Sequence, residues 1–263
     1  MLIRPAANPA VSSEPLEVYL IRRNSKMRFL GGYYAFPGGK VEPADVAPES
    51  LGRCIGLSAA VAEGLLPSRD LPALAFWVAA IRELFEETGV LMAADAAGHP
   101  PDLSEPAVAS RVKHCREAMV ASARSLGELL AAEGWVLDLR SLRYLSHFIT
   151  PSSSPIRFSA RFFLSRLPPG QEPRLFLEET SEAFWIGPRE GHQRFVAGEL
   201  AMAEPAEYAL AYLAQFESWD EVWSHHADGR HKFQGIVDRI EFYGQGYDWA
   251  TASWKPGKPP WQV

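Results

Sequence analysis

The segment from Leu74 to Gly89 places the tightest constraint on how this chain can fold. Stepped at about 100° per residue, as in a helix, it gathers apolar side chains on one side and glutamates on the other. The apolar stripe consists of Leu74, Trp77, Val78, Ile81, Leu84, Phe85 and Thr88. The pattern therefore predicts an amphipathic helix over about residues 72–88, with Pro72 in its first turn, Gly89 at its C-terminal cap and the stripe in the core.

The glutamates of this helix, Glu83, Glu86 and Glu87, repel one another. Glu83 and Glu87 form a like-charge i,i+4 pair, which is unfavourable by about 0.2–0.5 kcal/mol. Glu86 and Glu87 also lie near the helix C-terminus, where the helix dipole favours cations. Arg82 offsets only part of this repulsion, by reaching Glu86 one turn away. A solvated acidic face is one interpretation, and a site for a divalent cation is the other. Ligands that are all oxygen favour Mg²⁺ or Mn²⁺.

Composition narrows the class of protein. The 263 residues carry 26 basic and 32 acidic side chains, a net charge of −6, which argues against a general nucleic-acid partner. No apolar run approaches the roughly 20 residues of a membrane span, and the first residues lack the apolar core of a signal peptide. Cys54 and Cys115 provide no disulfide framework, which favours a reducing compartment. We therefore expect a cytoplasmic protein with no nucleic-acid and no membrane partner.

The order of predicted elements indicates one α/β (α+β) domain with insertions. Strands are expected at about 16–23, 33–36, 142–150, 156–167 and 183–186, and helices at about 72–88, 105–133, 188–199 and 205–216. Proline and glycine interrupt residues 46–72, which we expect to form an insertion. Residues 1–15 are expected to be a flexible lead-in, residues 16–228 the folded domain, and the aromatic and Pro-rich residues 229–263 a C-terminal extension.

A glycine turn upstream gives the acidic helix a specific context. Residues 36–42 read Phe-Pro-Gly-Gly-Lys-Val-Glu, and the paired glycines let a phosphate or metal approach the backbone. With residues 82–90, Arg-Glu-Leu-Phe-Glu-Glu-Thr-Gly-Val, this resembles the Nudix box, G-x5-E-x7-R-E-U-x-E-E-x-G-U, where U is aliphatic. The box begins at Gly39, and Asp45 stands in place of its first glutamate.

The box is interrupted, because 36 residues instead of seven separate Asp45 from Arg82. The cost of closing a loop rises only slowly with its length, so the two halves can still meet. An interrupted box resembles the long-insertion Nudix proteins related to peroxisomal coenzyme A diphosphatases. This resemblance extends over about residues 15–217. It implies a Nudix-like α/β/α sandwich around a mixed sheet, with a helical insertion inside the box.

The resemblance also implies the site of a hydrolase that uses Mg²⁺ or Mn²⁺. Glu83, Glu86 and Glu87 would be its metal ligands, with the Gly38 carbonyl as an extra one, and Arg82 would orient the glutamates. The metal ions would neutralise a diphosphate and lower the pKa of a bound water that attacks phosphorus. Related enzymes often draw a further catalytic carboxylate from a loop before a late strand. The candidate here is Glu179, with Glu178 and Glu182 as rivals and loop solvation as the alternative.

The segment before the box carries the features that bear on the substrate. Residues 19–39 resemble the motif LLTxRSx3Rx3Gx3FPGG of coenzyme A diphosphatases, although Asn24 replaces its serine. The candidate substrate-binding residues are those that match in register: Arg23, Arg28, Gly32 and Gly39. Coenzyme A carries an extra 3′-phosphate, for which clustered cations are appropriate. The alternative is a basic edge strand that discourages aggregation.

These features lead to three hypotheses about a small-molecule nucleotide-diphosphate substrate. The leading one is a pyrophosphatase that splits coenzyme A or acyl-CoA into 3′,5′-ADP and a 4′-phosphopantetheine product. The close alternative is the same chemistry on ADP-ribose, a nucleotide sugar, NADH or a dinucleoside polyphosphate. A non-catalytic Nudix domain that senses a nucleotide is the alternative from another class.

Two features of the C-terminal part are less specific. The histidines His225, His226 and His231 favour a packed or solvated cluster over a metal site, because no partner ligands with a known spacing accompany them. The aromatic tail favours packing against the domain, while stacking on adenine or a homodimer interface stays open.

Overall fold

The computed structural model describes residues 1–7, 14–27, 30–66, 68, 70–149, 158–177, 180–226, 247–248 and 253–254. Its central sheet has the order β3 (Tyr34–Ala35), β2 (Leu16–Arg23), β1 (Leu2–Pro5), β8 (Ser159–Arg166) and β7 (Leu142–Ile149). A sixth strand, β9 (Thr180–Ile186), pairs with the other edge of β2. The sheet is mixed, because β1 and β8 run parallel while the other pairs are antiparallel.

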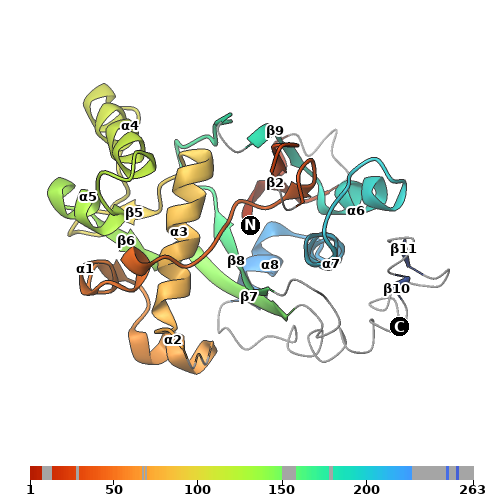
Figure 1. Ribbon diagram of the computed structural model, residues 1–263, viewed down its shortest axis with the longest axis horizontal. Helices are drawn as coiled ribbons and strands as arrows, with labels where there is room; N and C mark the ends of the chain where they lie inside the picture. Colours follow the sequence, from red (N-terminus) through yellow and green to blue (C-terminus); the bar gives the residue numbers. More distant parts are fainter. Residues whose placement is uncertain are drawn as a thin grey trace.

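Helices cover both faces of this sheet. Figure 1 shows α3 (Leu74–Thr88) on one side, and α6 (Pro188–Val196), α7 (Glu204–Leu213) and α8 (Trp219–His225) on the other. Two hydrophobic cores follow from this arrangement. Phe163 of β8 packs in the α3 core, and its neighbour Leu164 packs in the α7 core, as the alternation of side chains along a strand requires. The expected α/β/α sandwich around a mixed sheet is therefore confirmed.

The helix α3 forms where the apolar stripe predicted it. Every member of the stripe is buried, and Trp77, Ile81 and Phe85 are at most 2% exposed. The helix ends at Gly89, whose backbone has a left-handed φ of 74° and whose N–H donates to the Phe85 carbonyl. Glycine adopts this conformation at little cost, which explains why the helix stops there. Burial of the stripe thus fixes how α3 is rotated against the sheet.

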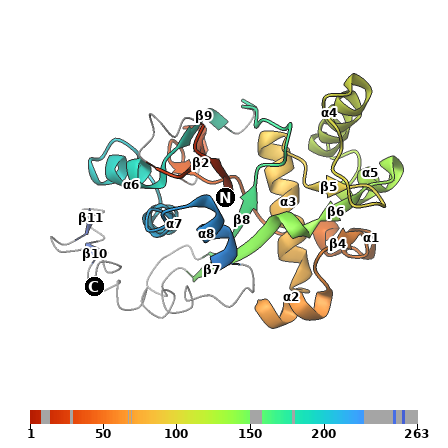
Figure 2. The same cartoon turned by 180° about the vertical axis from the view of Figure 1, so that it is seen from behind.

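The inserted residues fold into short elements of their own. They are α1 (Pro48–Leu51), β4 (Cys54–Ile55) and α2 (Ala59–Leu65), and the short η1 (Pro43–Val46) precedes them. Strand β4 joins β6 (Val136–Asp138) and β5 (Ala93–Ala94) in a small second sheet, and η2 (Leu139–Ser141) follows β6. The insertion therefore leaves the main sheet and pairs with segments that follow α3. Figure 2 shows these elements grouped around α3 from behind.

The helical stretch expected at 105–133 is two helices, α4 (Pro106–Val120) and α5 (Leu126–Glu133). Ser122, with a left-handed φ of 55°, lies in the break between them. Ser125 then starts α5 through a capping box, in which its hydroxyl accepts from the Glu128 N–H and the Glu128 carboxylate accepts from the Ser125 N–H. The stretch is therefore helical, with a break between its two helices.

Further elements differ from the sequence expectation. Residues 2–5, expected within a flexible lead-in, form β1, because Leu2 and Ile3 are fully buried between β2 and β8. The helix α8 was not predicted. Strands β10 (Tyr247–Asp248) and β11 (Ser253–Trp254) pair antiparallel in the C-terminal part. Among the described residues, no helix has the length and apolar character that a membrane crossing requires.

The buried stripe of α3 generates a prediction about stability. Phe85 is fully buried in the α3 core, so Phe85→Ala leaves a cavity and should lower the free energy of unfolding by about 3–5 kcal/mol. Val196, at the end of α6, is 67% exposed, and Val196→Ala should cost less than about 0.5 kcal/mol. Denaturant unfolding of both variants measures the difference. Similar losses for the two variants would contradict the burial of this face.

Candidate active site

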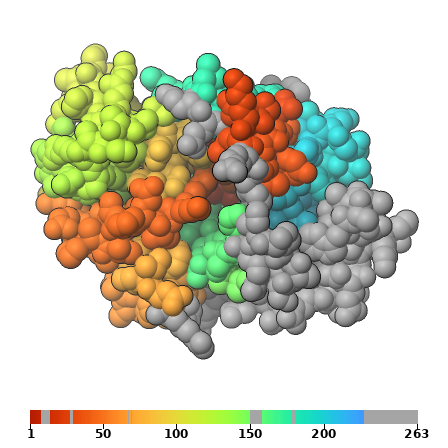
Figure 3. Space-filling view, in the orientation of Figure 1, coloured from red at the N-terminus to blue at the C-terminus, as the bar shows by residue number. Residues whose placement is uncertain are grey.

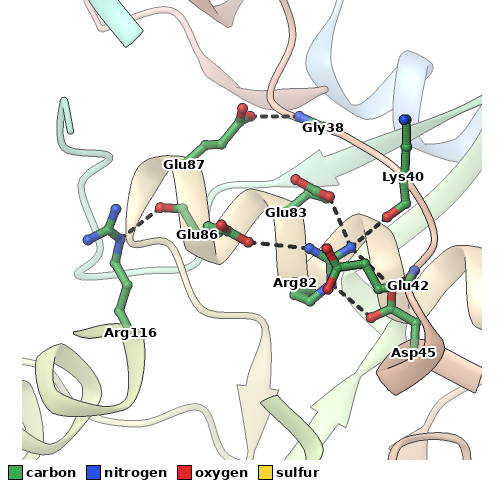
Figure 4. A network of polar contacts seen from close by, with 9 residues as sticks. All are labelled: Gly38, Lys40, Glu42, Asp45, Arg82, Glu83, Glu86, Glu87 and Arg116. Atoms are coloured by element: carbon green, nitrogen blue, oxygen red, sulfur yellow. Dashed lines mark hydrogen bonds and ion pairs between the residues drawn. The ribbon is translucent and has the colours of Figure 1, made fainter. Parts of the chain in front are cut away.

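Arg82 lies at the centre of the candidate site. Its side chain is buried and reaches both halves of the interrupted box (Figure 4). Nε and Nη2 donate to the two carboxylate oxygens of Asp45 at 2.9 and 3.1 Å, and Nη2 also donates to the Lys40 carbonyl at 2.6 Å. On its own helix, Arg82 pairs with Glu83 at 2.9 Å and with Glu86 at 3.3 Å. The two halves of the box therefore meet through this guanidinium.

Asp45 is placed for this contact by the turn that precedes the insertion. It lies in η1, is 2% exposed, and accepts a hydrogen bond from the Glu42 N–H at 2.8 Å. The Asp45 N–H in turn donates back to Glu42, which completes a capping box. In this position the shorter carboxylate binds both Arg82 donors. The residues inserted between Asp45 and the start of α3 loop out, and Asp45 and Arg82 stay in contact.

The glycine turn packs directly on the carboxylate face of α3. A Cβ atom on Gly39 would lie 2.4 Å from Oε1 of Glu83, so a side chain at this position would displace the Glu83 carboxylate. The Gly38 N–H donates to Oε2 of Glu87 at 2.7 Å. Burial raises the pKa of Glu83 to about 7; the neighbouring Arg82 opposes this rise, and the charge of Glu86 adds to it. The turn and the helix thus enclose a carboxylate that is costly to ionise without a cation.

The glutamates have the right chemistry for a divalent cation, but each has a protein partner in this conformation. Glu83 and Glu86 pair with Arg82, and Glu87 accepts from the glycine turn. Within the described ranges, no three acidic, histidine or cysteine side chains converge on one metal position. Carboxylate oxygens suit Mg²⁺ and Mn²⁺, so the donor types fit. The side chains would have to turn from these partners to bind an ion together.

Arg116 is a residue of this region that the sequence analysis missed. It extends from α4, is 8% exposed, and its Nε donates to the backbone carbonyl of Glu86 at 2.7 Å (Figure 4). Its guanidinium also stacks on the ring of Phe176, 3.1 Å from the centre. A cation at this carbonyl opposes the negative end of the helix dipole. The repulsion noted for Glu86 and Glu87 was the signal that could have prompted a search for such a residue.

The chain that leaves α3 is also held in place. The Gln171 side chain accepts from the Leu91 N–H at 2.8 Å and donates to the Leu91 carbonyl at 2.9 Å. The Arg174 N–H donates to the carbonyl of Thr88, in the last turn of the helix. These bonds, like that of Arg116, restrain the end of α3 that carries the glutamates.

Of the residues expected to bind the substrate before the box, the structure describes Arg23 and Gly32 but not Arg28. Arg23 ends β2, and its buried Nε has no hydrogen-bond partner within the described part of the chain. Gly32 has a φ of 81° and follows the same turn, where its N–H donates to the Arg23 carbonyl. Arg28 lies outside the described residues, so the structure does not place it beside Arg23.

The candidate carboxylates before β9 are only partly placed. Glu178 and Glu179 lie outside the described residues. Their rival Glu182 accepts from the Tyr34 hydroxyl at 2.8 Å and lies 3.7 Å from Arg22. Of the three histidines, His226 packs against the ring of Tyr212 in α7 and contacts its hydroxyl, whereas His231 lies outside the described residues.

The fold and the joined box define a Nudix hydrolase, and comparison with known proteins agrees. The family model described as the NUDT19 Nudix domain matches residues 63–213, so the chain belongs to this family of hydrolases. A crystal structure of a NUDIX hydrolase from Alicyclobacillus acidocaldarius is 32% identical, with a TM-score of 0.65, and the match covers 85% of this chain and 92% of that one.

Curated relatives carry more specific names. The chain is 29% identical over 203 residues to "Putative nudix hydrolase 7" of Caenorhabditis elegans, a match that covers 77% of this chain. It is 29% and 28% identical to "Acyl-coenzyme A diphosphatase NUDT19" of Gallus gallus and Homo sapiens, over 81% and 80% of this chain. The matches span 57%, 65% and 64% of these three relatives' own lengths.

The contact of Arg116 generates a second prediction. Arg116→Met removes a charged donor from the end of α3, so the free energy of unfolding should fall by about 1–3 kcal/mol. The matched control is Arg111→Met on the same helix. Arg111 is 49% exposed and pairs with Glu133, so its loss should cost at most about 1 kcal/mol. Denaturant unfolding measures both, and equal losses would show that the Glu86 carbonyl does not depend on Arg116.

Proposed function

We propose that the chain is a metal-dependent hydrolase that cuts a phosphoanhydride bond in a nucleoside diphosphate linked to another group. The observation that carries the proposal is the union of the two box halves through Arg82. It brings Glu83 and Glu87 against the glycine turn, where Gly39 leaves no side chain in the way. Close approach of a backbone turn to a row of carboxylates is suited to a diphosphate bound together with cations.

In this proposal Glu83, Glu86 and Glu87 hold Mg²⁺ or Mn²⁺, with the Gly38 carbonyl as an extra ligand. The cation supplies charge neutralisation at the diphosphate and a bound water of lowered pKa. Arg82 keeps Glu83 and Glu86 on one face of α3, and Arg116 keeps the backbone of Glu86 in place. Glu179 stays the candidate for a further catalytic carboxylate.

We propose coenzyme A or acyl-CoA as the substrate, with 3′,5′-ADP and a 4′-phosphopantetheine product. Support comes from the motif of residues 19–39, which places Arg23, Arg28 and Gly32 in register, and from the relatives named acyl-coenzyme A diphosphatase. Activity on ADP-ribose, a nucleotide sugar, NADH or a dinucleoside polyphosphate is the alternative that the same site allows.

The third prediction tests the hydrolase itself. Wild type with Mg²⁺ or Mn²⁺ should cleave at least one substrate of a panel that contains coenzyme A, ADP-ribose, NADH and a dinucleoside polyphosphate. Glu86→Gln keeps the shape of the side chain but removes its charge, so kcat should fall by more than about a hundredfold, beyond the loss typical of outer ligands. Glu190→Gln on α6, whose carboxylate is 60% exposed and pairs only with Arg194 among the described residues, is the control and should stay active.

The result that would contradict the proposal is specific. If wild type and Glu86→Gln were equally inert while both bound nucleotide in an equilibrium titration, the chain would be a nucleotide sensor and not an enzyme.

The fourth prediction tests the substrate. The double variant Arg23→Ala with Arg28→Ala removes two cations of the coenzyme A motif. Its kcat/KM should fall at least about tenfold more on coenzyme A than on ADP-ribose, because only coenzyme A carries the extra 3′-phosphate. ADP-ribose is the internal control for the catalytic site. An equal loss on both substrates would remove the motif as an argument for coenzyme A.

A further inference from the structure

The carboxylate side of α3 continues toward the helix N-terminus with an aromatic residue. With Arg82 set at 0° and each residue advancing by about 100°, Phe76 falls at about 120° on the helical wheel. This position lies between those of Glu83 and Glu87, at about 100° and 140°. Phe76 is nevertheless 9% exposed. Ala79 and Ala80 lie between Phe76 and Glu83 on this side, and their methyl groups occupy little space. The surface from Phe76 to the glutamates is thus a strip of α3 without long side chains.

An arginine covers Phe76. The Arg161 guanidinium lies 4.1 Å from the centre of the Phe76 ring. Arg161 is in β8 and pairs across the sheet with His147 of β7. It lies two residues before Phe163, so it shares the face of the sheet that α3 covers. The end of the β7–β8 pair therefore brings a cation to the same side of α3 as the glutamates.

Ser159 connects the two members of this pair. Nη1 of Arg161 donates to the Ser159 carbonyl at 2.9 Å and to its hydroxyl at 3.0 Å. Nε2 of His147 lies 2.8 Å from the same hydroxyl. The three side chains form a cluster where β7 ends and β8 begins, which we call the Arg161 cluster. Figure 3 shows the surface hollowed between the inserted segment in orange and β7–β8 in green.

The Arg161 cluster is positively charged and incompletely paired. The Nε of Arg161 is buried without a hydrogen-bond partner among the described residues. Burial lowers the pKa of Arg161, while Tyr144 and Asp70 raise it. Burial and the charge of Arg161 lower the pKa of His147, which disfavours its charged form, and the Arg161 guanidinium provides the charge of the cluster. A cation with an unused donor is suited to an anion.

We propose that the Arg161 cluster binds a second phosphate of the substrate, separate from the diphosphate that is cut. The seven residues from Phe76 to Glu83 correspond to about 10 Å along the helix axis. That separation matches a nucleotide with a diphosphate on its 5′ side and a phosphate monoester on its 3′ side. The inference rests on the proposed function, and it assigns to the 3′-phosphate a residue outside the basic segment of residues 22–28.

The first experiment measures binding of nucleotides, so its result does not depend on whether the protein is catalytically active. Wild type, Arg161→Gln and Arg161→Lys are titrated with 3′,5′-ADP and with 5′-AMP by calorimetry. Wild type should bind 3′,5′-ADP at least about tenfold more tightly than 5′-AMP, and Arg161→Gln should abolish that preference. Arg161→Lys keeps the positive charge and should retain part of the preference for 3′,5′-ADP. Arg166→Gln is the matched control. Arg166 also lies in β8 and stacks on aromatic rings, but these rings belong to α8 and not to α3, so the variant should keep the preference for 3′,5′-ADP.

Kinetics then separate this inference from the proposed function. Arg161→Gln should raise KM for coenzyme A about tenfold or more, and leave KM for dephospho-coenzyme A within about twofold. The inference is overturned if wild type shows no preference for 3′,5′-ADP or if the preference survives Arg161→Gln. It is also overturned if Arg161→Gln raises KM equally for coenzyme A and dephospho-coenzyme A. Failure of wild type to cleave either substrate would instead overturn coenzyme A as the proposed substrate. Unchanged thermal unfolding of the folded variants excludes a general loss of structure.

Discussion

The buried contact between Arg82 and Asp45 is the interaction on which the site depends. Removing these two charges from water costs several kcal/mol per ion, and only good geometry with further hydrogen bonds offsets that cost. Both carboxylate oxygens of Asp45 are used, and the Lys40 carbonyl takes another donor. Burial alone would lower the pKa of Arg82, but its bonds to Asp45 and the surrounding acids raise it. The guanidinium therefore stays charged and fixes where the glycine turn meets α3.

This contact also explains how the fold tolerates an interrupted box. A longer loop adds little closure entropy, so the insertion costs little if its own residues find partners. They do so outside the main sheet: β4 pairs with β6, and the Leu137 N–H donates to the Arg53 carbonyl. The Cβ-free position at Gly127 also lets α5 approach Ser50 of α1. The insertion is therefore held by segments that follow α3, while Asp45 holds its beginning at the site.

The elements with strong local patterns could be predicted from the sequence, and those that depend on distant partners could not. The helix α3 was foreseen because its stripe repeats with the helical period, and Gly89 marks its end. Strands of two residues, such as β4 and β5, have no period to detect. Arg116 lies 30 residues beyond Glu86, and Arg161 reaches from β8 to Phe76 of α3. Neither contact can therefore be predicted from the residues next to these arginines in the sequence. A surplus of acid on a predicted helix indicates only that cations are needed, not which residues supply them.

The distribution of charge around α3 indicates which kind of ligand the site can bind. Arg82 divides its charge between Asp45, Glu83 and Glu86, and Arg116 donates to the backbone carbonyl of Glu86. One buried guanidinium is thus shared by three carboxylates. Burial raises the pKa of Glu83 to about 7 although Arg82 is its direct neighbour, and the charge of Glu86 adds to the rise. A bound cation would stabilise the charged form of this carboxylate, which, together with the oxygen ligands of this helix face, supports the proposed metal dependence.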